Sequence, residues 1–126
     1  MADKCSCGEK TVLFYACSGG ANVAEIADKA ARRLMFEGKG AMFCLAGIAA
    51  GIQGMIRQAK DAGVNLVIDG CSMDCAKKIF DAAGIANYRY VRVTDLGIEK
   101  VKGVHCTDEQ VERVVAKAYE ALGTTT

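Results

Sequence analysis

Two cysteines, Cys71 and Cys75, lie four residues apart where a short apolar run gives way to an amphipathic segment. If that segment is a helix, both side chains lie on one face, with Cβ atoms ~5–6 Å apart. A disulfide needs Cβ atoms ~3.5–4.5 Å apart, so a bridge between these two cysteines would be strained. Two thiolates bound ~2.3 Å from one tetrahedral zinc ion escape this restriction, because rotamer choice brings the sulfur atoms together. The spacing therefore favours a shared metal ion.

The rest of the chain alternates predicted strands and helices. Short β-prone runs predict strands at residues 11–16, 41–45, 65–68 and 88–93. Apolar residues at helical spacing predict helices over residues 23–35, 48–59, 76–83 and 111–122, the last preceded by a capping box at Thr107 and Gln110. Four strand–helix repeats predict a single α/β domain over residues 11–123, with a flexible arm at residues 1–10 and a tail at 124–126. The expected fold is an open, mostly parallel four-stranded sheet with helices on both faces, Rossmann- or flavodoxin-like.

Four cysteines fall at the carboxyl ends of the predicted strands, where open α/β sheets form their ligand crevice. Cys17, Cys44 and Cys71 each end a strand, and Cys75 lies one turn into the following helix. Helix N-termini also face this edge, and their dipoles favour thiolate over thiol. We therefore expect the four thiols to gather at one edge. Because unpaired cysteine is often a buried core residue, that role is the alternative for each of them.

The composition of the chain indicates its compartment and the kinds of partner that it favours. The sequence has seven cysteines, an odd number, and begins without an apolar signal segment, which together predict a cytoplasmic protein without a disulfide framework. The net charge of +1 gives no support for nucleic acid or a membrane surface as a partner. The most apolar run, residues 41–52, is about half the length needed to span a bilayer.

Three segments of the chain resemble a known family. The matching residues are Cys17-Ser18-Gly19-Gly20-Ala21-Asn22, Phe43-Cys44-Leu45-Ala46-Gly47-Ile48, and Asp69-Gly70-Cys71 with Cys75-Ala76. They resemble the DGC-domain family, named for its Asp-Gly-Cys triplet and regarded as zinc-binding. The resemblance implies that Cys17, Cys44, Cys71 and Cys75 bind zinc, and it implies no reaction.

Further candidates surround this core set. The pair Cys5 and Cys7, and the neighbours His105 and Cys106, are candidate extra ligands. Ser18, Gly19 and Gly20 precede a helix and are a candidate turn for binding a small anion through backbone N–H groups. Asp69 has two interpretations: a carboxylate that acts beside the metal, or one that binds the backbone of its own turn.

The sequence thus predicts a protein that holds one zinc ion in a site of four cysteines, with a structural, sensing or storage role. One alternative is an enzyme of thiol or sulfur chemistry, and another is an open three-thiolate zinc enzyme that acts on a small anion. The ligand type also permits an iron–sulfur cluster. An edge strand and small-residue helices are compatible with a homodimer, on which the sequence does not decide.

Overall fold

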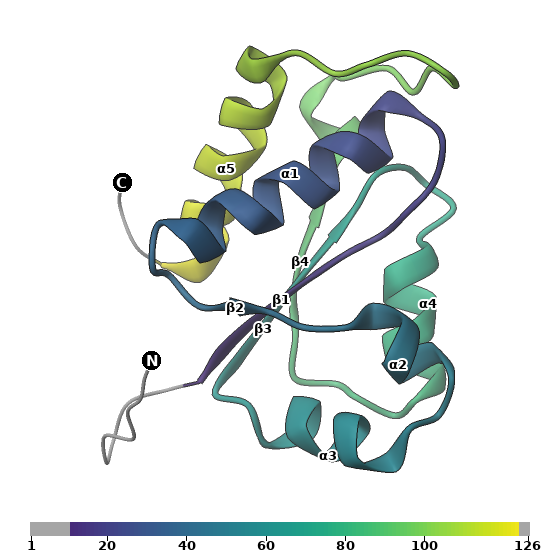
Figure 1. The fold of residues 1–126 in the computed structure, drawn as a ribbon, viewed down its shortest axis with the longest axis vertical. Helices are drawn as coiled ribbons and strands as arrows, with labels where there is room; N and C mark the ends of the chain where they lie inside the picture. The colour runs from purple at the N-terminus through teal and green to yellow at the C-terminus, as the bar shows by residue number, and fades with distance from the viewer. Residues whose placement is uncertain (1–10, 124–126) are drawn as a thin grey trace.

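The computed structural model describes residues 11–123 and contains one four-stranded sheet between two layers of helices (Figure 1). The strands are β1 (Val12–Ala16), β2 (Ala41–Met42), β3 (Val64–Asp69) and β4 (Arg89–Arg92), in the spatial order β2-β1-β3-β4. All three strand pairs are parallel. The predicted α/β fold is therefore confirmed. The predictions for the arm and tail, including Cys5 and Cys7, lie outside the described residues.

Helices follow each strand. They are α1 (Asn22–Phe36), α2 (Leu45–Ala49), α3 (Gln53–Asp61), α4 (Cys75–Ala82) and α5 (Asp108–Leu122), and the 3-10 helix η1 (Val93–Leu96) directly follows β4. Helices α1 and α5 cover one face of the sheet, and α2, α3 and α4 lie on the other (Figure 1). No helix within residues 11–123 is long and apolar enough to cross a membrane.

Alternating side chains of the central strands divide the core into two parts. Along β1, Phe14 packs in the cluster under α1 and α5, whereas Leu13 and Tyr15 pack with α2, α3 and α4. This alternation follows from the two-residue period of a strand. Every residue of β3 is buried, as expected for a central parallel strand covered on both faces.

The region around Cys44 differs from the prediction. Strand β2 ends at Met42 instead of residue 45, so Cys44 lies beyond the strand as the N-cap of α2, and its Sγ accepts the N–H of Gly47 at 3.3 Å. The single helix predicted over residues 48–59 is two helices. Gly51, with a φ of 79°, supplies the left-handed backbone that ends α2 before α3 begins.

Candidate functional site

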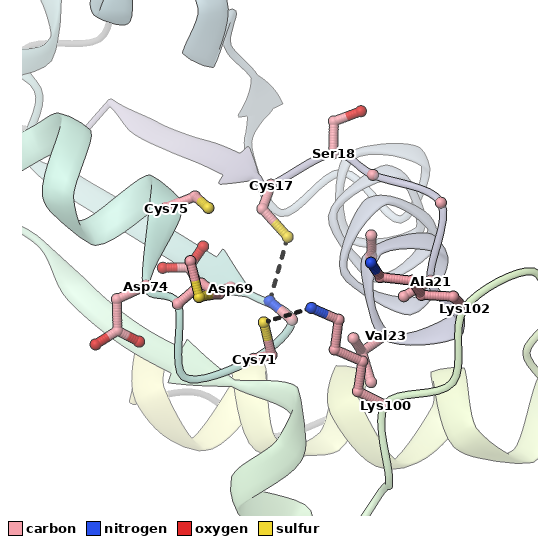
Figure 2. A pocket seen from close by; sticks show the side chains of 15 residues that line it. Cys17, Ser18, Ala21, Val23, Asp69, Cys71, Asp74, Cys75, Lys100 and Lys102 are labelled. Atoms are coloured by element: carbon pink, nitrogen blue, oxygen red, sulfur yellow. Dashed lines mark hydrogen bonds between the residues drawn. The ribbon is translucent and has the colours of Figure 1, made fainter.

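A pocket of about 330 Å³ lies at the carboxyl edge of the sheet (Figure 2). It is bordered by the start of α1, the loop from β3 to α4, and the loop 97–106 between η1 and α5. Three of the predicted ligands, Cys17, Cys71 and Cys75, line this thiol pocket, whereas Cys44 does not. Cys44 is exposed at the start of α2, and every cysteine within residues 11–123 is a free thiol.

Cys17 is half-buried, as is Cys71, whereas Cys75 is exposed. Cys17 follows β1, and its Sγ accepts the backbone N–H of Gly70 at 3.2 Å. Burial raises the pKa of the Cys17 thiol from 9.0 to about 11, although the Gly70 N–H acts in the opposite direction. At neutral pH this side chain is therefore a thiol, and a bound metal would have to displace its proton.

Asp69 and Gly70 fix the backbone that carries Cys71. The buried Asp69 carboxylate accepts the N–H of Ala76 at 2.9 Å and that of Lys77 at 3.0 Å, so it caps the first turn of α4. These hydrogen bonds support the interpretation in which the Asp69 carboxylate binds the backbone of its own turn. A Cβ on Gly70 would lie 2.9 Å from Cγ2 of Val23 and 3.0 Å from its carbonyl carbon. Gly70 therefore allows the loop to pass directly against α1.

Two residues of β4 hold the loop between Cys71 and Cys75. The Tyr90 hydroxyl lies 2.7 Å from Asp69 Oδ2 and 2.9 Å from Asp74 Oδ1. Arg92 donates to Asp74 from Nε at 2.9 Å and from Nη2 at 2.9 Å, and this pairing is the main cause of the lowered pKa of Asp74. Asp74 is the only non-glycine residue within 11–123 that has a positive φ, 56°. The β4 side chains thus stabilise a backbone conformation that is unfavourable in isolation.

The sequence pattern predicts Tyr90 and Arg92 only as alternating positions of an outer strand. Their place at the carboxyl end of the fourth strand, the same edge as the cysteines, is the one sequence signal for a role at the site. The pattern does not predict Lys100 and Lys102, which line the thiol pocket from the loop 97–106. No local pattern marks these lysines, because only the fold brings that loop to the pocket.

The candidate anion-binding turn lies at the thiol pocket, which Ser18, Gly19 and Gly20 all line. The N–H groups at the start of α1 are already used, however. Asn22 N–H donates to Val101 O at 3.0 Å, and Val23 N–H donates to the Asn22 side chain at 2.8 Å. The start of α1 therefore offers few unpaired N–H groups to an anion. An anion at this turn would depend on other hydrogen-bond donors.

His105 and Cys106 do not line the thiol pocket. His105 is exposed and lines a neighbouring hollow that shares Cys17 and the residue 18–20 turn with the thiol pocket. The Cys106 N–H donates to Glu25 Oε1 at 2.9 Å, and His105 Nδ1 lies 3.5 Å from the same oxygen. These contacts connect the end of the loop 97–106 to α1, and neither residue lines the thiol pocket.

The donor set at the pocket suits zinc in kind, because thiolates are soft ligands that select such metals. As positioned within residues 11–123, no group of three or more His, Cys, Asp or Glu side chains could hold a metal ion. Zinc binding therefore requires the side chains at the pocket to turn toward a common point. Zinc and its ligand set remain predictions.

Comparison with known proteins gives the family. The family model described as "DGC domain" matches residues 13–118. The chain is also 30% identical over 110 residues to a protein of Pseudomonas aeruginosa named "Anaerobic and virulence modulator AnvM", and the alignment covers 87% of this chain and 84% of that protein. No solved structure matches the chain significantly. This family match, which spans most of the chain, shows that the protein belongs to the DGC domain family.

Proposed function

We propose that this protein binds one zinc ion at the thiol pocket through Cys17, Cys71 and Cys75, with Cys44 as the fourth ligand. One observation supports this proposal most: thiols that follow two different strands, β1 and β3, line a single pocket together. A zinc ion bound there would cross-link the segments that follow β1, β2 and β3. Among structural, sensing and storage roles, the similarity to a protein named as a modulator favours sensing.

The surroundings of the pocket suit a negatively charged zinc–thiolate centre. Four thiolates around Zn²⁺ leave a formal charge of −2. The ammonium group of Lys100 lies 3.5 Å from Cys71 Sγ, and Cys75 is the first residue of α4, at the positive end of the helix dipole. Both features offset part of that charge. The Arg92 and Tyr90 contacts to Asp74 limit the freedom of the loop that carries Cys71, which lowers the entropic cost of bringing it to a metal.

The first experiment measures metal content and reactive thiols per chain after purification without added metal. We expect about one zinc per chain and four protected thiols. The substitution Cys71→Ser should abolish zinc binding and lower thermal stability, because binding free energy in such sites contributes to folding. The matched control is Cys106→Ser, since Cys106 lies outside the pocket and should leave the zinc content unchanged. Unchanged zinc content in Cys71→Ser would refute the proposal. Visible absorbance from bound iron would indicate that the site holds an iron–sulfur cluster instead of zinc.

Cys44 decides between a closed and an open site. Its position outside the pocket means that zinc would have to draw it in from the start of α2. If Cys44 is the fourth ligand, Cys44→Ser should reduce zinc affinity strongly and leave a three-thiolate site with an exchangeable position. Competition with a chromogenic chelator measures this affinity. An affinity equal to that of the Cys106→Ser control would exclude Cys44 from the ligand set.

A further inference from the structure

Two lysines line the thiol pocket without an acidic partner among residues 11–123. Lys100 and Lys102 both line the pocket from the loop 97–106 (Figure 2). None of the ion pairs among residues 11–123 includes either side chain. The only side-chain contact of Lys100 recorded among the described residues is with Cys71 Sγ, at 3.5 Å. Within the described residues, two positive charges at this pocket therefore lack a carboxylate counter-charge.

The two carboxylates that line the same pocket accept hydrogen bonds from other groups. Asp69 accepts the N–H groups of Ala76 and Lys77 and is contacted by the Tyr90 hydroxyl. Asp74 pairs with Arg92 through two nitrogen atoms and also lies next to Tyr90. Arg92 offsets the charge of Asp74, whereas the hydrogen-bond donors of Asp69 are neutral groups. Among the described residues that line the pocket, the two lysines and Asp69 together therefore leave a net positive formal charge, which attracts anions.

The backbone on both sides of each lysine is fixed to the start of α1. The buried Asn22 side chain donates to Glu99 O at 2.9 Å and accepts the N–H of Val101 at 2.7 Å. Gly103 N–H then donates to Gly20 O at 2.8 Å, beside a bridge between Ala21 and Lys102. The anchored residues thus alternate with Lys100 and Lys102. Because the loop backbone is already ordered, binding an anion there costs little additional loop entropy.

We infer that the thiol pocket binds a small dianionic group of the phosphate or sulfate class, held by Lys100 and Lys102. Within the described residues neither ammonium group has a carboxylate partner, and the residue 18–20 turn lines the same pocket. The volume of about 330 Å³ exceeds that of an inorganic oxyanion and leaves room for a small organic part. The apolar side chains of Val23 and Met73 also line the pocket. Neither lysine is a proposed zinc ligand, but Lys100 also contacts Cys71 Sγ, so the anion proposal and the metal proposal share this side chain.

The test is a titration of the full chain with sulfate and with phenyl phosphate at constant ionic strength, followed by ¹H–¹⁵N NMR. We expect saturable shifts of the Gly19, Gly20 and Lys102 amides. Removing one ammonium group ~4 Å from an anion weakens binding about fivefold, even at the dielectric constant of water. The double variant with Lys100→Gln and Lys102→Gln should therefore lose more than tenfold in affinity.

The control is Lys117→Gln, which removes one positive charge from the exposed face of α5 and should bind both anions as the wild type does. Equal binding by the double variant and this control would overturn the inference, as would shifts that do not saturate. Zinc content is measured in every variant, so a zinc-replete protein that fails to bind anions counts against this inference alone. A double variant that loses zinc but retains anion binding also overturns it, because the lysines then serve the metal. Tighter binding of phenyl phosphate than of sulfate identifies an ester as the ligand, and equal binding identifies the inorganic ion.

Discussion

Replacing Asp69 with asparagine tests whether the carboxylate of the Asp-Gly-Cys triplet holds the start of α4. In the structure, Asp69 Oδ1 accepts the Ala76 N–H at 2.9 Å, and Oδ2 accepts the Lys77 N–H at 3.0 Å. The Tyr90 hydroxyl lies 2.7 Å from Oδ2, and the residue is only 1% exposed. Water therefore has little access to replace any contact that the substitution removes.

The size of the effect follows from these contacts. Asparagine has one acceptor oxygen, so either amide orientation turns an NH₂ group toward a backbone N–H of α4. A hydrogen bond to a charged group contributes about 1.5–3 kcal/mol, and a buried donor left unpaired costs about 1–3 kcal/mol. We therefore expect Asp69→Asn to lower the free energy of unfolding by about 2–3 kcal/mol. For a chain of this length that corresponds to a fall in Tm of about 6–15 °C.

The assay is thermal and urea unfolding of the zinc-free protein in chelator, which removes any contribution of the metal. The matched control is Asp28→Asn, an exposed carboxylate that forms an (i, i+4) ion pair with Arg32 at 2.7 Å. Pairs of this kind contribute about 0.3–0.5 kcal/mol, so the control should lower Tm by no more than about 2 °C. If Asp69→Asn unfolds within the same range as this control, Asp69 does not stabilise α4 in the way described.

Three further outcomes are expected. Gly70→Ala should destabilise the protein by about 1–3 kcal/mol in urea, because the new Cβ overlaps the side chain and backbone of Val23, whereas equal stability of the two proteins would contradict this close approach. In the zinc-free protein at about pH 8, alkylation followed by mass spectrometry should modify the exposed Cys75 well before Cys17, whose burial raises its pKa to about 11; equal rates would argue against an enclosed Cys17. Backbone and side-chain hydrogen bonds lower the pKa of Glu25 from 4.5 to about 2 in the folded state, so its contribution to stability is present above pH 4.5 and is lost as the pH falls toward 2. Wild type and Glu25→Gln should accordingly differ in urea midpoint at neutral pH and converge near pH 2, and a constant difference would refute this linkage.

The sheet and most helices could be predicted because their signals are local. The apolar runs of β1 and β3 and the helical spacing of α1 and α5 each lie within one segment, and the buried faces follow from them. The boundary near Cys44 could not, since an apolar run that continues from strand into helix has no distinguishing period. There the Cys44 sulfur accepts a backbone N–H at the start of α2, so the position of this helix start depends on local hydrogen bonding.

The site was predictable only where topology determines it. Parallel strands bring Cys17 and Cys71 to one edge, so their approach to a common pocket followed from the fold class. Two other contacts join segments that are distant in the chain: Arg92 with Asp74, and Lys100 with Cys71. No periodic pattern in the sequence marks these residues. Residues of this kind become visible only when side-chain positions are known.

The Asp-Gly-Cys triplet combines three separate physical requirements in one turn. Asp69 satisfies the N–H groups of α4, Gly70 permits contact with α1 and donates to Cys17, and Cys71 brings a thiol to the pocket. The first two requirements concern folding, and only the third concerns chemistry. Cys71→Ala in the zinc-free protein should therefore unfold close to the wild type, while Asp69→Asn and Gly70→Ala should not. If Cys71→Ala is as unstable as those two variants even without metal, the triplet acts as one packing unit, and its cysteine is no evidence for a metal site.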